Sequence, residues 1–179
     1  MNTGQMLLSV GAVVLLGATV IAVNRSSLQN GTILQQTQIG IYAISLASST
    51  IEEASGMDFD ENTVSGAITS TSSLSTTLGA ESGETTNPQS TAKFDDFDDF
   101  NSLTAKYDSV PGVDKFTTKC KVYYVNDASP DVKVTGPTWF KRMDVTVWGS
   151  GVADTGRKKY GIATGDTIKM SYVFSYLNF

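Results

Sequence analysis

The sequence predicts an α+β protein in which one long amino-terminal helix packs on a small antiparallel β-sheet. The first observation behind this class is a stretch without charge or proline over residues 1–24, which continues to residue 51 with Arg25 as its single charge. The second is a set of three runs after residue 115 in which polar and apolar residues alternate. Such alternation is typical of antiparallel strands with one buried face. We therefore expect a helix over residues 1–55 and a globular head over residues 56–179.

The helix begins with the apolar segment Met6–Val23, which contains neither a charge nor a proline. A bilayer-spanning helix needs about 20 residues, and the uncharged run to Asn24 is long enough. Three interpretations compete: a cleavable secretory signal, a simple transmembrane anchor, and a helix that starts in the membrane and ends inside a polymer. A signal peptide normally starts with positive charges, which this sequence lacks before Arg25.

The residues after the apolar segment favour a helix that ends inside a polymer. No charge occurs from Ser26 to Ile51, whereas a solvated helix normally carries Glu and Lys on its outer face. A helix with apolar residues on several faces is expected to have neighbours on every side. The stripe predicted to cover the sheet consists of Ile44, Ala47, Ile51 and Ala54. The residues predicted to join neighbouring helices are Leu7, Leu8, Val13, Leu15, Leu16, Ile21, Ile33, Ile39, Tyr42 and Ile44.

A segment rich in Ser, Thr and Gly over residues 62–92 follows the helix. This composition is typical of an exposed loop rather than of a packed element. Its few apolar residues are expected to anchor the loop to the head, and they are Val64, Ile68, Leu74 and Leu78.

The next segment, Phe94–Asn101, has the sequence FDDFDDFN and places four carboxylates among three phenyl rings. The rings recur every three residues, so a short helical turn is expected to point them to one side and the carboxylates to solvent. The alternative is a Ca²⁺ site, because hard cations prefer clustered oxygen ligands. The calcium-loop pattern with a central Gly and a terminal Glu is absent. We expect no cofactor. In the alternative that calcium binds, its ligands would be Asp95, Asp96, Asp98 and Asp99.

Three alternating runs between residues 115 and 177 predict the antiparallel sheet. One side of each run is β-branched, aromatic or otherwise apolar, as strands usually are. The predicted inward residues are Phe116, Thr118, Cys120, Val122 and Tyr124 in the first run, Met143, Val145 and Val147 in the second, and Ile168, Met170, Tyr172, Phe174 and Tyr176 in the third. Cys120 is expected to be a buried apolar residue rather than a reactive thiol. Trp139 and Trp148 are expected in the core or at its rim.

The charge pattern argues against a nucleic-acid partner. The net charge is −5, with Arg25 as the only cation before Lys93, and neither half of the chain has the basic stripe that nucleic acids require. The basic segment Arg157–Lys159 is interpreted as a solvated hairpin tip, with the alternative that it meets the acidic turn of a neighbouring copy. The sequence contains no histidine, and no catalytic triad or phosphate-binding loop, so we expect no enzymatic activity.

Taken together, a short polar leader ending at Gly4–Gln5, the apolar segment and the long low-charge helix resemble the type IV pilin and pseudopilin superfamily. The acidic turn after Leu78 and Gly79 is similar to that of pilin-like heads. The resemblance implies a pilin-like fold, cleavage of the leader between Gly4 and Gln5, and helices that bundle into a filament core. It also implies an inner-membrane location before assembly and an extracellular filament afterwards, with identical subunits and the pilus assembly machinery as partners.

The sequence therefore predicts a structural subunit of a type IV pilus-like extracellular filament. One alternative is a monomeric, membrane-anchored surface binding module, whose helix would act as a solvated stalk. Another is a minor pilin or pseudopilin of a secretion system.

Overall fold

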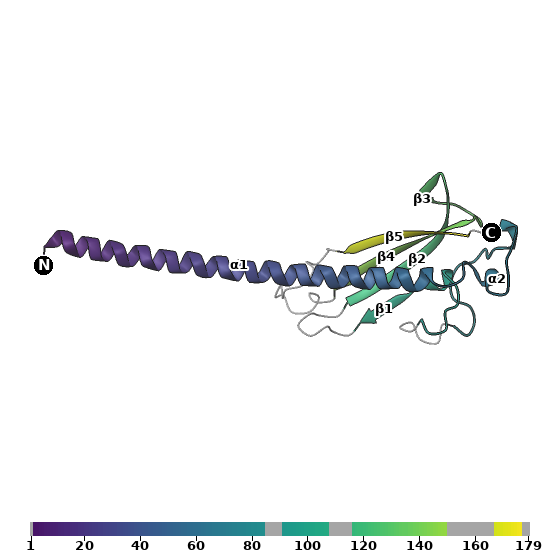
Figure 1. The fold of residues 1–179 in the computed structure, drawn as a ribbon, viewed down its shortest axis with the longest axis horizontal. Helices are drawn as coiled ribbons and strands as arrows, with labels where there is room; N and C mark the ends of the chain where they lie inside the picture. Colours follow the sequence, from purple (N-terminus) through teal and green to yellow (C-terminus); the bar gives the residue numbers. More distant parts are fainter. Residues whose placement is uncertain (1, 85–90, 108–115, 150–166, 177–179) are drawn as a thin grey trace. The chain divides into compact units, whose positions relative to one another are not determined.

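The computed structural model describes residues 2–84, 91–107, 116–149 and 167–176. The chain divides into two compact units, Met1–Gln38 and Ile39–Phe179. Within the described residues there is a long amino-terminal helix and a small antiparallel sheet, which confirms the predicted α+β class (Figure 1).

Helix α1 runs from Thr3 to Ser55 and comprises 53 residues. No proline interrupts it, and several of its hydroxyl side chains bond back to the preceding turn. Ser9 donates to the Gln5 carbonyl at 2.9 Å, for example. These local bonds satisfy hydroxyls within the helix itself. The helix ends at Ser55, and the N–H of the following Gly56 donates to the Glu52 carbonyl at 3.2 Å.

The sheet belongs to the second unit and is antiparallel throughout. Its strand order is β1-β2-β4-β5, and β3 pairs with the end of β2 (Figure 1). The strands are β1 (Thr104–Tyr107), β2 (Phe116–Asn126), β3 (Ser129–Lys133), β4 (Phe140–Gly149) and β5 (Ile168–Ser175). A short helix, α2 (Glu61–Val64), and two 3₁₀ turns, Thr71–Ser73 and Asp98–Phe100, lie between α1 and β1.

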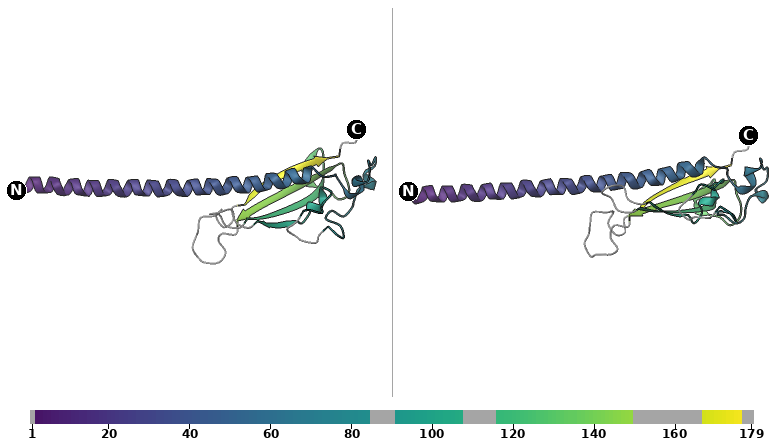
Figure 2. Two further views of the ribbon diagram at one scale, coloured as in Figure 1. Left: turned by 60° about the horizontal axis from the view of Figure 1, so that its bottom comes forward. Right: turned by 90° about the horizontal axis from the view of Figure 1, so that it is seen from below.

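The last part of α1 packs on one face of the sheet (Figure 2). The predicted covering stripe was wrong at one position, because Ile44 is 49% exposed. Successive helix residues lie about 100° apart, so the face that starts at Ile39 turns Ile44 away from the sheet. The small side chains of three alanines allow close packing here. The buried apolar residues of this face are Ile39, Ala43, Ala47, Ile51 and Ala54.

The alternation of buried and open residues along β2 and β4 is confirmed. Every predicted inward residue of these two strands is buried, including the free thiol of Cys120. The third predicted run is only half-buried along β5, where Tyr172 is 37% exposed. Trp139 is half-buried and stacks on Tyr176 with ring centroids 5.4 Å apart, while Trp148 is also half-buried.

The loop after α2 is held by fewer apolar anchors than predicted. Leu74 is buried, and Ile68 and Leu78 are half-buried. Val64 is exposed, so its predicted anchoring role was wrong. The basic segment Arg157–Lys159 lies outside the described residues.

Candidate functional site

The exposed apolar surface of α1 is the first candidate site. By length and composition, the segment Thr3–Gly31 is long and apolar enough to cross a membrane. Most residues predicted to join neighbouring helices are exposed, and these are Leu7, Leu8, Val13, Leu15, Leu16, Ile21, Ile33, Tyr42 and Ile44. Ile39 differs, because it is buried in the core of its own head. It is therefore unavailable for a contact between subunits.

Exposed apolar side chains continue along α1 beyond the segment that can span a membrane. Ile33, Leu34 and Ile41 are all more than half exposed, and Tyr42 and Ile44 are open to a lesser degree. A spanning helix needs only about 20 residues. A membrane-spanning segment would account for the first part of the apolar surface, and it would leave these five residues without a covering partner in the described chain.

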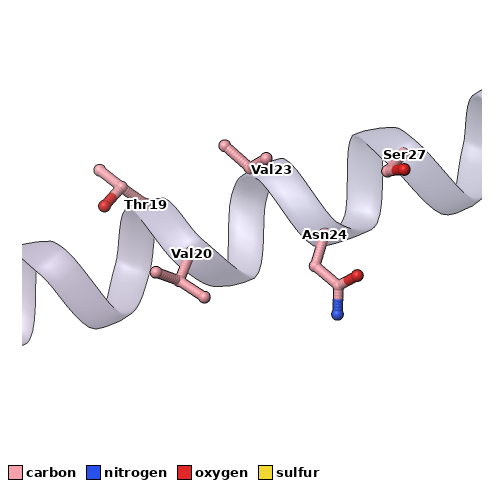
Figure 3. Close-up of a pocket in the computed structure, with 5 residues that line it drawn as sticks. All are labelled: Thr19, Val20, Val23, Asn24 and Ser27. Atoms are coloured by element: carbon pink, nitrogen blue, oxygen red, sulfur yellow. The ribbon is translucent and has the colours of Figure 1, made fainter.

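The first unit has a shallow depression on the surface of α1. It is lined by side chains from two turns of α1, as Figure 3 shows: Thr19, Val20, Val23, Asn24 and Ser27. All five belong to the same helix, so no second described element closes the depression. Binding sites for small molecules are normally concave and bury most of the ligand, so we do not interpret this depression as a ligand site.

The acidic turn is the second candidate site, and its predicted orientation was wrong. Asp96, Asp98 and Asp99 are buried, and Asp95 alone among the four aspartates is exposed. The phenyl rings of the turn are buried as predicted. The carboxylates turn inward because each finds hydrogen-bond donors there, which offsets the cost of removing a charge from water.

Two of these carboxylates close the turn on itself. The Asp96 Oδ1 atom accepts the N–H groups of Asp98 and Asp99 at 2.7 and 3.1 Å. The Asp99 Oδ2 atom accepts those of Asp95 and Asp96 at 3.0 and 3.2 Å. Such bonds from a short side chain to nearby backbone are typical of turns. The turn is also tied to the segment that follows α1, because the Phe97 N–H donates to the Asp58 carbonyl at 2.8 Å.

The Asn that ends the turn connects it to the sheet. Asn101 Nδ2 donates to the Leu78 carbonyl at 2.8 Å, and its Oδ1 accepts the Val122 N–H of β2 at 3.0 Å. Gly79, which has a φ of 135°, donates its N–H to Asp98 Oδ2 at 3.2 Å. The Leu-Gly pair and the acidic turn, far apart in the sequence, are thus one local structure.

A lysine from β4 pairs with the inward carboxylates. Lys141 is fully buried, and its Nζ atom lies 2.8 Å from Asp60 Oδ2. The same Nζ atom pairs with Asp98 Oδ1 and donates to the Phe59 carbonyl at 2.6 Å. The Phe59 and Tyr124 rings lie beside it, with centroids 4.6 and 5.4 Å away. We refer to Asp60, Asp98 and Lys141 as the buried ion network.

The two carboxylates of this network have different surroundings. Asp60 accepts hydrogen bonds from the Ser75 N–H and hydroxyl at 3.1 and 2.9 Å and from the Tyr124 hydroxyl at 3.1 Å. Burial acts to raise the pKa of Asp60, but the bond to Lys141, its charge and the bonds from Ser75 outweigh burial and lower the pKa. For Asp98 burial prevails over Lys141, and the pKa is raised.

Lys141 and Asp60 were not predicted from the sequence, although a signal for Lys141 was present. Because side chains alternate along a strand, Lys141 lies on the same face of β4 as Met143 and Val145. It also lies opposite Tyr124 of β2. Extending the alternation by one step would have placed a lysine on the inward face. Asp60 has only a local signal, since its side chain caps the short helix α2.

The four aspartates predicted as calcium ligands do not form one group. Asp98 pairs with Lys141, and Asp96 bonds to backbone N–H groups. Asp95 and Asp99 instead lie with Glu84, and Glu84 also lies with Glu61 and Glu81. Carboxylates in such groups suit a hard cation but are also common without one, so calcium binding stays a prediction.

Gly4 and Gln5, the predicted processing positions, lie in the first turn of α1 and are exposed. Cleavage of the chain between Gly4 and Gln5 stays a prediction.

No protein-family model, curated protein or solved structure matches the chain.

The acidic groups predict how stability changes with pH. Burial and nearby carboxylates raise the pKa of Asp96 to about 8 and that of Glu81 to about 7, and burial raises the pKa of Asp99 to about 6. Unfolded carboxyl groups titrate near pH 4. Between about pH 4 and the raised pKa values, the folded head therefore binds more protons than the unfolded chain does. We expect the free energy of unfolding to fall as the pH rises from about 5 to about 8, by up to about 1.4 kcal/mol per pH unit for each extra proton bound.

Urea unfolding followed by tryptophan fluorescence at several pH values would measure this slope. Glu81→Gln removes one of the titrating groups and is expected to reduce it. Stability that instead increases over the same pH range would contradict the prediction.

Proposed function

We propose that the chain is a structural subunit of a type IV pilus-like extracellular filament, which polymerises through helix α1. The observation that supports the proposal best is the exposed apolar surface at Ile33, Leu34, Ile41, Tyr42 and Ile44. These residues extend beyond the segment that a membrane would cover. Neighbouring copies of the same helix would cover them.

The composition of α1 fits such a role. Arg25 is its only charged residue before Glu52, so few charges have to be desolvated when helices associate. Five glycines of α1 have nothing within 4 Å of the position that a Cβ would occupy, and they are Gly4, Gly11, Gly17, Gly31 and Gly40. Small residues at a helix surface let neighbouring backbones approach closely.

In the proposed assembly the inner membrane holds the subunit before polymerisation, with the apolar part of α1 in lipid. Prepilin-type cleavage between Gly4 and Gln5 would precede assembly by the pilus machinery. Polymerisation then exchanges contacts with lipid for contacts between helices. The heads remain outside the helical core, which fits the polar outer face of the sheet around Lys119, Lys121 and Arg142.

A charge at Ile41 tests the proposal. Ile41 is 62% exposed, so Ile41→Glu should leave the head folded and membrane insertion intact. In a packed bundle of helices the new carboxylate would be buried without a partner, which opposes assembly. We expect the yield of sheared surface filaments, counted by electron microscopy, to fall at least about tenfold, because each 1.4 kcal/mol changes an equilibrium tenfold.

Ile41→Leu is the matched control and is expected to form filaments like the unchanged chain. Filaments from Ile41→Glu at the normal yield would contradict a helical core that includes this residue. Absence of filaments from the unchanged chain would instead favour a monomeric, membrane-anchored binding module.

A further inference from the structure

The buried ion network has a composition that goes beyond a simple ion pair. One amine and two carboxylates meet in a site that no solvent reaches: Lys141 and Asp60 are fully buried, and Asp98 is 1% exposed. Aromatic rings of Phe59 and Tyr124 lie beside the amine. Removing an ammonium and a carboxylate from water is costly, and mutual attraction only partly compensates for it.

We propose that Lys141 and Asp98 condense to an intramolecular amide, an isopeptide bond between Lys141 Nζ and Asp98 Cγ. The amine and the carboxylate are already in hydrogen-bond contact. Reacting groups held in this way behave as if present at an effective concentration of about 10⁵ M or more. Condensation also removes two buried charges, which favours the amide over the ion pair in a site without water.

The surroundings select Asp98 rather than Asp60 as the reacting carboxyl. Asp60 accepts hydrogen bonds from Asn62, Ser75 and Tyr124 in addition to Lys141, and these bonds stabilise its anionic form. Asp98 accepts from the Gly79 N–H and from Lys141. Burial raises the pKa of Asp98, so its carboxyl takes up a proton readily. A carboxylic acid is a far better acceptor for an amine than a carboxylate is.

The groups present are sufficient for a balanced reaction. The Lys141 ammonium first gives one proton to Asp98 Oδ1, and the resulting amine attacks Cγ. The Gly79 N–H, 3.2 Å from Oδ2, stabilises the negative charge that develops on this oxygen. Asp60, 2.8 Å from Nζ, accepts a second proton from the nitrogen and passes it to Oδ1. The Nζ–Cγ bond forms, the Cγ–Oδ1 bond breaks, and Oδ1 leaves with both protons as water.

Asp60 is thus a proton carrier that ends the reaction as it began, and no oxidant or metal is needed. The product joins the 3₁₀ turn Asp98–Phe100 covalently to strand β4. This proposal does not depend on filament assembly, since every participating group belongs to one head.

Mass spectrometry of the full-length protein, purified in detergent and then denatured, tests the proposal directly. We expect the unchanged chain to be lighter by one water molecule than its sequence requires. Comparison with Lys141→Met, corrected for the substitution, cancels any processing at the amino terminus. After proteolysis, Asp98 and Lys141 should occur in one branched peptide whose fragments place the bond between them.

Two further variants test the assigned roles. Lys121→Met removes an exposed lysine of β2 and should leave the water deficit unchanged. Asp60→Asn removes the proton carrier. When this variant is measured shortly after synthesis, most molecules should have the full mass, without the loss of one water molecule. A fully joined Asp60→Asn would overturn the role of Asp60.

An unchanged chain with its full mass, and with a Lys141 amine that reacts with amine reagents after denaturation, would overturn the bond itself. This outcome is readable whether or not any variant folds, because the decisive measurement is made on the unchanged chain.

Discussion

Replacing Lys141 with alanine is expected to destabilise the head by at least about 3–5 kcal/mol, the usual cost of removing one partner from a buried charge pair, and loss of the proposed amide would add to this cost. The substitution leaves Asp60 and Asp98 facing the same cavity, with Nζ removed from contact with both. It also removes the hydrogen bond to the Phe59 carbonyl. Urea unfolding of the detergent-solubilised chain, followed by the fluorescence of Trp139 and Trp148, would measure the change.

The matched control is Lys121→Ala on the exposed side of β2, for which we expect a change within about 0.5 kcal/mol. Lys141→Met combined with Asp98→Asn removes both the cation and one buried carboxylate. We expect this pair to be less destabilising than the sum of its members, because groups in one network are not additive. Equal stabilities of Lys141→Ala and Lys121→Ala would show that the buried ion network contributes little.

The second large effect is expected from charges in the apolar part of α1. An aspartate at the centre of a membrane helix costs about 2.5–3.5 kcal/mol, so Val13→Asp together with Leu16→Asp should cost about 5–7 kcal/mol of insertion free energy. Both side chains are exposed in the protein, so the substitutions leave the core of the head unchanged. We expect most of the variant protein to be lost from the membrane fraction after alkaline extraction.

Thr37→Asp together with Ser45→Asp adds the same two charges to the same helix beyond the spanning segment. This control is expected to stay in the membrane fraction. Retention of the Val13→Asp and Leu16→Asp variant to the same extent would exclude lipid insertion of this segment as the anchor.

The strands of the sheet were predictable because side chains alternate strictly between its two faces. Phe116, Cys120 and Val145 are buried for this reason, and their alternation is visible without knowledge of the fold. The long helix was predictable from the absence of proline and charge. Its packed face was harder to predict, since apolar residues occur on several faces of α1 and local spacing did not distinguish Ala43 from Ile44.

The buried ion network was not predictable by the same reasoning. Polar and charged residues are usually exposed, so the four aspartates of the turn were assigned to solvent. For Asp98, what reverses this preference is a lysine 43 positions away in the sequence, which only the fold brings near. A short-range pattern carries no information about such a partner, although the parity of Lys141 along β4 indicated an unusual inward cation.

If the chain forms the filament proposed above, the position of Lys141 has a mechanical consequence. Helix α1 ends at Ser55, and a few residues later Phe59 and Asp60 are already fastened to the first residues of β4. Tension along a fibre would enter the head through this helix and reach the middle of the sheet almost at once. The loop that follows Asp60 belongs to the same fastening, because Ser75 bonds to Asp60 and Gly79 bonds to Asp98, so changes at these two positions would weaken the path of the force.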